Sequence, residues 1–513
     1  MPKRLPIFYS ALLLTGVNLL LRLVGTGFQV YISGRIGAEG VGLLQMVLSV
    51  GAMALVAGMA GVRTGTMYLT AEELGKGRGE NVTWVLSGSF LYSISFSAAL
   101  GLTLFFTAPW LAENWIRHLE TAGALRLYAS FLPVFCLSGV MTGYFTAANR
   151  IGTLAAVEVG EQAVTMAFTM AALYFWAGSN AARACISVVL GNCCGACFTL
   201  GSLVHLRRKE RVKTGKRIAV GRRLADTALP LAAADDLKTG INTVENLMVP
   251  VRLALCRTVD SPLGAFGVVS GMVFPVLMFP SCILFALTEL LIPELARCSA
   301  AGSRDRIRYL TKRGLKVSAL YGLVFCGLEC LLAVPLCEGL YDNGQAGKEL
   351  MLYALLIPML YCDLITDAMV KGLGRQKVSV CYNILTSALD VVLLYFLLPE
   401  YGMWGYFLSF LLTHLLNFCL SLRLLLSITK VCLPMKRILF ALCAAVFAVT
   451  ASRSLRNPGA RAAAYLLLLG SGLCLTGVTG KEDFHWLRGM VKPSVEKDVK
   501  TPLPKERRQV IGR

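Results

Sequence analysis

The sequence predicts an all-α integral membrane protein with about 14 transmembrane helices, and three observations support this fold class. Of its 513 residues, 56% are hydrophobic and only 16% are charged, whereas soluble domains carry roughly 25% charged residues. The apolar residues fall into runs of about 20, the length that crosses a hydrocarbon core of roughly 30 Å. An internal repeat then divides most of these runs into two groups of six.

The apolar runs give the expected helices in order. Six lie near residues 8–32, 41–62, 83–107, 124–147, 153–177 and 183–205. Six more follow a basic connector, near residues 224–254, 263–292, 317–337, 350–370, 378–398 and 403–427. Two final runs lie near residues 438–455 and 460–480. We therefore expect a first lobe over 1–215, a second lobe over 216–430, a C-terminal helix pair over 431–480 and a polar, disordered cytoplasmic tail over 481–513.

The distribution of positive charge predicts the orientation. The chain has 50 Lys and Arg residues and a formal net charge of +20. Lys and Arg accumulate in cytoplasmic loops, and with both termini inside, 38 of them lie inside and 8 outside. The last helix pair fits this rule least well, because Arg453, Arg456 and Arg461 fall outside. The charge therefore indicates topology and contact with membrane lipids, and we expect no nucleic-acid partner.

The run over 224–254 is unusually polar, since it contains Asp235, Asp236, Lys238 and Glu245. Basic clusters flank it and the next run, and both clusters favour the cytoplasm, so two crossings must separate them. We therefore expect this run to span the membrane with its polar face toward the bundle or a wet cavity.

The repeat has a register of 225 residues. Residues 133–150 align with residues 358–375, and each copy has a proline seventeen residues before a basic exit from the membrane. At the same offset, Gly42 aligns with Gly267. Six helices separate the copies, so the two lobes are expected to be parallel repeats around a central path.

The 17 cysteines do not indicate a metal site or a disulfide framework. Most lie within apolar runs, and the single CxxC pair, Cys194 and Cys197, has no second pair or nearby histidine. We interpret them as buried free thiols and expect no metal and no cofactor, apart from a coupling ion, Na⁺ or H⁺.

Several stretches resemble a known family. These are RLVGTGFQVYISGRIGAEGVGLLQM, LSGVMTGYFTAANR, EVGEQ, VENLMVPVRL, SGMVFPVLMFPSCILFALTELLIPEL, VKGLGRQ and PEYGMWGY. In order and spacing, over roughly residues 5–430, they are similar to the stage V sporulation protein B-like polysaccharide transporters. These belong to the multidrug/oligosaccharidyl-lipid/polysaccharide exporter superfamily.

The resemblance implies two six-helix lobes that form a V around a central cavity and open alternately to either side. It also implies a monomer in the bacterial plasma membrane that flips an undecaprenyl-diphosphate-linked saccharide, such as lipid II, to the outer leaflet for cell-wall synthesis, alongside cell-wall synthesis proteins. A multidrug or cation exporter driven by sodium or protons is the alternative, because a fold does not dictate its cargo. A non-transporting membrane enzyme or scaffold is the third reading. Under the leading reading we expect no catalytic residue, because a flippase breaks no bond.

Four residues are expected to line the central cavity and bind an anionic head group: Arg22, Lys238, Glu245 and Arg252. Arginine matches phosphate oxygens with its planar guanidinium, and Arg22 resembles the first cavity arginine of lipid II flippases, although Phe28 stands where a second is expected. Lys238 and Arg252 flank Glu245 by seven residues each way, so the three share one helix face. The alternatives are an internal ion pair for Arg22 and a neutralised structural cluster for the others.

Five carboxylates within predicted spans are candidates for ion coupling: Glu158, Glu161, Asp363, Asp367 and Asp390. Carboxylates can bind sodium or exchange protons, and hydrogen bonding between helices is the alternative. No GxxxxGK[ST] phosphate-binding loop occurs in the sequence, so we expect an ionic or electrical driving force.

The run over 263–292 contains Gly267, Gly271, Pro275 and Pro280. Such residues interrupt helices, and we expect them to act as hinges or, alternatively, only as packing kinks.

Overall fold

The computed structural model describes residues 7–178, 180–208, 220–432 and 434–478. Within these ranges the structure is helical and contains no strand, which confirms the predicted fold class. Nine of the described helices are long and apolar enough to cross a membrane, or up to eleven if each bent pair is one span. The count of fourteen stays a prediction, as does the disordered tail over 481–513, which lies outside the described residues.

The first six predicted runs form α1 and α3 to α6, and α2 lies between α1 and α3. Their bounds are α1 (Ile7–Met59), α2 (Val62–Gly75), α3 (Val82–Leu111), α4 (Ala122–Ala147), α5 (Ile151–Ala172) and α6 (Ala181–Arg208), with short 3₁₀ or π segments at Gly79–Asn81, Ala112–Ile116, Leu119–Thr121 and Leu173–Ala177. We call these helices the first half. Two predicted runs share α1, which is kinked at Gly37, where φ is 70°, a backbone conformation that favours glycine.

The segment over 63–82 was expected to be a cytoplasmic loop, but α2 occupies most of it. The helix breaks at Ala60 and Gly61, whose φ angles are 40° and 70°, and then continues for 14 residues. A Cβ atom on Gly61 would lie 2.3 Å from the carbonyl oxygen of Ala228 in α7. This close approach between backbones requires glycine, so the break was not readable from hydropathy.

The second half comprises α7 to α15. Their bounds are α7 (Gly221–Leu253), α8 (Pro262–Gly267), η5 (Val268–Val273), α9 (Phe274–Met278), α10 (Ser281–Ala300), α11 (Arg304–Tyr341), α12 (Gly344–Ala354), α13 (Ile357–Gly372), α14 (Gln376–Tyr401) and α15 (Met403–Thr429). The run over 263–292 is bent by 61° between Met278 and Ser281, and the run over 350–370 by 57° between Ala354 and Ile357. The second bend was not predicted.

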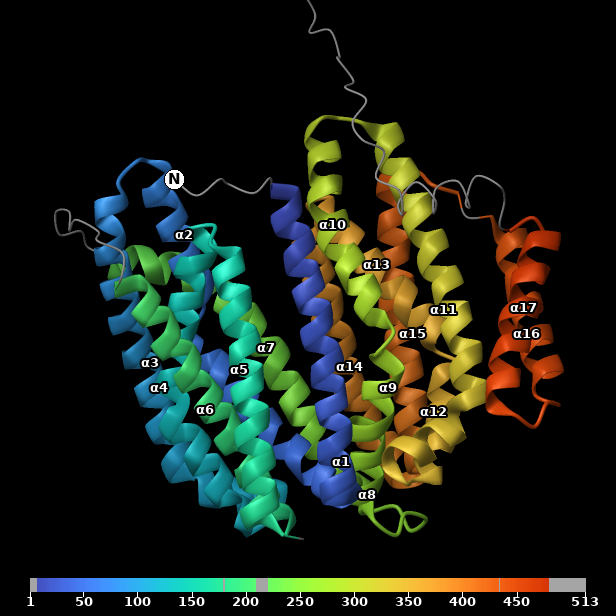
Figure 1. Cartoon of the computed structure of the whole chain (residues 1–513), viewed down its shortest axis with the longest axis horizontal. Helices are drawn as coiled ribbons and strands as arrows, with labels where there is room; N and C mark the ends of the chain where they lie inside the picture. Colours follow the sequence, from blue (N-terminus) through green and yellow to red (C-terminus); the bar gives the residue numbers. More distant parts are fainter. Residues whose placement is uncertain (1–6, 179, 209–219, 433, 479–513) are drawn as a thin grey trace, which may run out of the picture.

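Figure 1 shows the two halves side by side, with α3 to α6 on the left and α10 to α15 on the right. The first arm of α1 stands between them. Helix α7 contacts both groups. Arg223, near its start, forms ion pairs with Glu72 (2.9 Å) and Glu73 (3.4 Å) of α2, whereas Arg252, near its end, donates to the backbone carbonyl of Tyr395 in α14. Helix α7 therefore links the halves.

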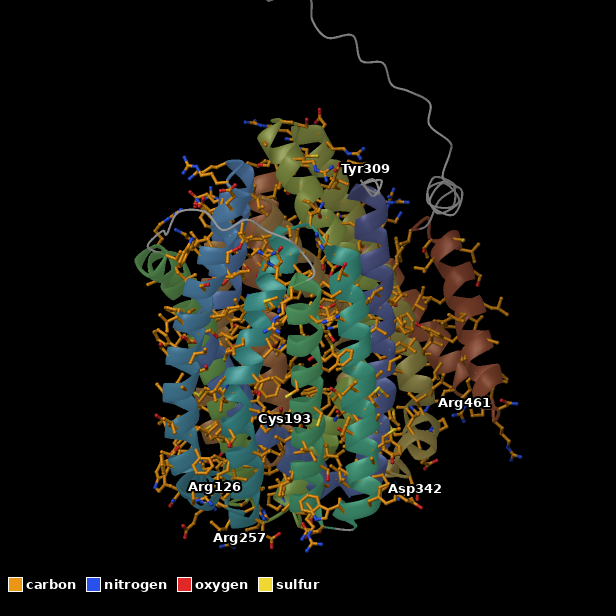
Figure 2. The ribbon with its side chains drawn as sticks, turned by 60° about the vertical axis from the view of Figure 1, so that its left-hand side comes forward. Arg126, Cys193, Arg257, Tyr309, Asp342 and Arg461 are labelled. Atoms are coloured by element: carbon orange, nitrogen blue, oxygen red, sulfur yellow. The ribbon has the colours of Figure 1, made fainter. Side chains whose placement is uncertain are left out.

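Two basic segments, 297–316 and 371–377, define what we call the basic end. Tyr309 lies at this end, while Arg126, Arg257 and Asp342 lie at the opposite end (Figure 2). The sequence rule predicts that the basic end faces the cytoplasm.

The last two helices, α16 (Met435–Ser452) and α17 (Pro458–Leu475), lie against α11 at the edge of the molecule (Figure 1). The fully buried Tyr465 donates its hydroxyl to the carbonyl oxygen of Leu323 at 2.6 Å. A Cβ atom on Gly327 would lie 2.1 Å from the Tyr465 ring, so this contact depends on the glycine.

We expect Gly327→Leu to displace α17 from α11 and to lower the melting temperature of the purified protein, because overpacking a contact costs about 1–3 kcal/mol. Thermal unfolding in detergent measures this. Gly339→Leu, in the same helix but with open space around its Cβ position, is the matched control. Equal melting temperatures for both variants would contradict the assigned contact.

Candidate cation and substrate site

A cavity of about 440 Å³ lies between α1, α7, α14 and α15. Its lining is mainly polar: Gln45, Lys238, Asn242, Glu245, Asn246, Ser270, Asn383, Thr386, Ser387, Asp390, Tyr406, Thr413, His414 and Asn417, with Phe274 and Phe410. Polar side chains within a membrane bundle are costly and usually mark a functional path. The cavity is therefore the main candidate site.

Two acidic side chains from different helices meet in this cavity. The side chains of Glu245 on α7 and Asp390 on α14 both line this cavity, and their carboxyl groups interact with each other. Asp390 also accepts hydrogen bonds from the hydroxyls of Ser409 at 2.5 Å and Thr413 at 3.2 Å. Two ionised carboxylates this close repel each other unless a cation or a proton lies between them. The arrangement suits a small cation with oxygen ligands.

Lys238 lines the same cavity and places a positive charge halfway along α7. It lies 17 residues after Gly221 and 15 residues before Leu253. Its side chain is exposed, and it has no hydrogen bond or ion pair within the described part of the chain. It is thus available to an anionic group.

Arg22 lies in a separate hollow of about 290 Å³ between α1 and α10. Its guanidinium carbon is 3.9 Å from the centre of the Phe285 ring, and Glu289 also lines this hollow. Arg22 is 15 residues from Ile7 and 15 from the kink at Gly37, so it is at mid-depth. No ion pair of Arg22 occurs among the described residues.

Arg252 lies away from the cavity. Its guanidinium donates two hydrogen bonds to the Tyr395 carbonyl, at 2.9 and 3.1 Å, and stacks over the Tyr395 ring at 3.7 Å. The structure therefore brings Lys238 and Glu245 together in one cavity, but it places Arg22 and Arg252 elsewhere. Residues seven apart drift around a straight helix by about 20°, and the local partner decides where each long side chain turns.

Asp363 and Asp367 lie one helical turn apart on α13, inside the second half. Asp363 accepts a hydrogen bond from the Asn417 amide at 3.0 Å. Asp367 forms an ion pair with Lys371 at 2.5 Å and accepts a hydrogen bond from Ser379. Asn417 lines the cavity, so these aspartates continue the site toward the basic end.

The carboxylates of the first half lie apart from this cavity. Glu161 on α5 accepts a hydrogen bond from the Thr199 hydroxyl at 2.7 Å. Glu158 is half-buried one turn away. Their geometry matches the alternative of hydrogen bonding between helices as well as it matches ion coupling.

The predicted hinge residues lie where α8, η5 and α9 meet α1. A Cβ atom on Gly267 would lie 1.9 Å from the Ala38 carbonyl oxygen, and one on Gly271 would lie 1.8 Å from a Val41 methyl group. Pro275 begins α9. Pro280 lies at the 61° bend, where its carbonyl accepts a hydrogen bond from the Tyr321 hydroxyl at 2.7 Å. The two glycines therefore allow α8 and η5 to pack closely against α1. Pro280 lies within the break at which the helix bends.

Sequence reasoning missed most of the uncharged cavity residues. A signal was present, because Ser409, Thr413, Asn417 and Ser421 recur every four residues within an apolar run. This spacing places them on one helix face. Their hydropathy alone did not distinguish this face from ordinary helix packing.

No family model matches the chain. Stage V sporulation protein B of Bacillus subtilis (strain 168) is 22% identical over 410 residues, which cover 77% of this chain and 79% of that protein. Among solved structures, an inward-facing multidrug resistance MATE family transporter of the MOP superfamily has a TM-score of 0.65 at 15% identity, covering 81% of this chain and 99% of that chain. Lipid II flippase MurJ, in an inward closed conformation, has a TM-score of 0.64 at 12% identity, covering 94% of this chain and 100% of that chain.

The solved structures establish the shared fold. The chain is therefore a multi-pass membrane protein that shares the fold of these transporters.

Proposed function

We propose that this transporter moves a lipid-linked saccharide with an anionic diphosphate head from the inner to the outer leaflet of a bacterial plasma membrane, where it supplies cell-wall synthesis. In this proposal the basic end and both termini face the cytoplasm, and the two halves open alternately. The inside-negative membrane potential favours outward movement of the anionic head by about 2.3 kcal/mol per charge per 100 mV.

The observation that carries the proposal is the pair of available cations at mid-depth. Arg22 and Lys238 lie near the middle of α1 and α7, each in a hollow, and neither has an ion-pair partner among the described residues. Holding such charges within a membrane is costly unless they meet water or an anion. A diphosphate head group is an anion of the required kind.

The carboxyl pair of Glu245 and Asp390 supports cation coupling in this proposal. A sodium ion or a proton between them would relieve their repulsion and would join α7 to α14. Since α7 also contacts the first half through Arg223, the presence of the cation would change the relative arrangement of the two halves. Binding energy at the cation site could then drive the conformational change.

We expect Arg22→Ala to weaken head-group binding roughly tenfold to 150-fold, because a hydrogen bond to a charged group is worth about 1.5–3 kcal/mol. The measurement is translocation of a labelled undecaprenyl-diphosphate saccharide in proteoliposomes. Arg126→Ala, which removes an arginine stacked on Phe105, is the matched control. Normal translocation by Arg22→Ala would remove the main support for the proposal.

A multidrug exporter is the second candidate, and the acidic pair favours it. A cavity that combines Glu245 and Asp390 with Phe274 and Phe410 could hold an organic cation through charge and aromatic contacts. Export of a fluorescent cationic dye by the same proteoliposomes tests this. Dye export without saccharide translocation would replace the first proposal with this one.

A further inference from the structure

A line of polar side chains leads from the cavity into the interior of the second half. Asp390 accepts a hydrogen bond from Thr413 at 3.2 Å, and Asn417 lies one turn beyond Thr413 on α15. The Asn417 amide donates to Asp363 of α13 at 3.0 Å, and Asp367 lies one turn beyond Asp363. Each step spans a hydrogen bond or about 6 Å of helix. We call these five residues the polar file.

The polar file ends at the basic end of the molecule. Asp367 forms an ion pair with Lys371 at 2.5 Å and accepts a hydrogen bond from Ser379. The Lys371 side chain is 36% exposed and that of Asp367 is 21% exposed. The file therefore connects the buried carboxyl pair with the protein surface.

Several atoms along the file lack a protein partner. Asp363 Oδ1, Asn417 Oδ1 and Ser421 Oγ are buried and have no hydrogen-bond partner in the described part of the chain. Asn417 is only 6% exposed and Ser421 only 1%. Buried polar atoms are nearly always hydrogen-bonded, to protein or to water. These atoms therefore indicate places for water or a small cation between α13 and α15.

Helix packing alone does not explain this arrangement. A hydrogen bond between helices satisfies both partners, whereas the Asn417–Asp363 contact leaves one oxygen of each residue without a partner. The acidic residues also favour cations over anions, and their spacing of one turn suits an ion that moves from one oxygen cluster to the next.

We propose that the polar file is the route by which the coupling cation passes between the Glu245–Asp390 pair and the basic end, and that the Lys371–Asp367 ion pair closes it. This inference rests on the proposed function only in requiring cation coupling. The ammonium group of Lys371 occupies the outermost carboxylate, so an entering cation must displace it. The lipid-linked saccharide follows a separate path between the two halves in this proposal.

Cation exchange in proteoliposomes tests the route, with radioactive sodium in one arm and a pH-sensitive dye inside the vesicles in the other. The arm that responds identifies the cation. We expect Asn417→Leu to slow exchange about tenfold or more, because an apolar side chain removes an oxygen step from the file.

Lys371→Gln should speed exchange, because it removes the competing charge from Asp367. Lys377→Gln, which neutralises an exposed lysine at the same end outside the file, should exchange at the wild-type rate. If Asn417→Leu fails to fold, the comparison of Lys371→Gln with Lys377→Gln still decides the question.

The outcomes separate this inference from the proposed function. Wild-type exchange rates for Asn417→Leu and Lys371→Gln, together with loss of cation binding in Glu245→Gln, would overturn the route and leave the coupling site in place. A wild-type protein that exchanges neither sodium nor protons would overturn both the route and cation coupling, whereas the proposed cargo is decided separately by saccharide translocation.

Discussion

Replacing Gly267 with leucine is expected to abolish transport by preventing the two halves from closing at the end opposite the basic end. A Cβ atom at this position would lie 1.9 Å from the Ala38 carbonyl oxygen and 2.7 Å from the Gly42 nitrogen. In return, a Cβ atom on Gly42 would lie 2.3 Å from the Leu263 carbonyl oxygen. Helices α1 and α8 therefore cross backbone to backbone, and Figure 1 shows them meeting at this end.

The size of the effect follows from the cost of overpacking. Inserting a side chain into such a contact costs about 1–3 kcal/mol, which shifts the equilibrium between closed and open states roughly fivefold to 150-fold. The Glu39–Ser261 hydrogen bond, 2.5 Å long across the same crossing, would break with it. A transporter that cannot close one end cannot alternate.

Two measurements check this result. Saccharide translocation in proteoliposomes should be lost, and a cysteine at Glu39 should react faster with a membrane-impermeant thiol reagent when Gly267 is leucine. Gly201→Leu, at an exposed position of α6 with open space around its Cβ, is the control. Unchanged thiol reactivity would show that the crossing does not close this end.

Neutralising the acidic pair should remove cation coupling. We expect Glu245→Gln or Asp390→Asn to weaken cation binding at least about tenfold, because each removes one of two carboxylates that would share the ion. Asp390 also accepts hydrogen bonds from Ser409 and Thr413, so its asparagine variant should disturb the site more.

The measurement is cation binding to the purified protein, followed by translocation with and without an imposed ion gradient. Glu161→Gln is the matched comparison, because Glu161 is a membrane carboxylate with a hydroxyl partner in the first half. A larger loss in Glu161→Gln than in Glu245→Gln would move the coupling site to the first half.

The links between the halves explain why both variants affect one cycle. The Glu245–Asp390 pair joins α7 to α14, whereas Arg223 joins the other end of α7 to Glu72 and Glu73 of α2. A cation that changes the first contact therefore acts on a helix held by the second. The glycine crossing of α1 and α8 lies at the end opposite the basic end.

Hydropathy and charge suffice to predict most of the long helices of this protein and the basic end, but not α2. Apolar runs are local, so each is visible in its own stretch of sequence, and the polar run over 224–254 is α7 almost to the residue. The parity of basic loops also indicated that its polar face looks into the protein. Glu245 and Lys238 do line a cavity there.

The sequence by itself thus determined where most of the long helices lie, which end is basic and which polar residues a bundle must shelter. Only the tertiary structure decided that Glu245 meets Asp390, that Arg252 turns to Tyr395, and that the helix breaks at Gly61. The physical reason is the distance along the sequence over which each property is determined. Membrane insertion depends on the free energy of each segment, whereas side-chain partners and backbone crossings depend on residues more than a hundred positions apart.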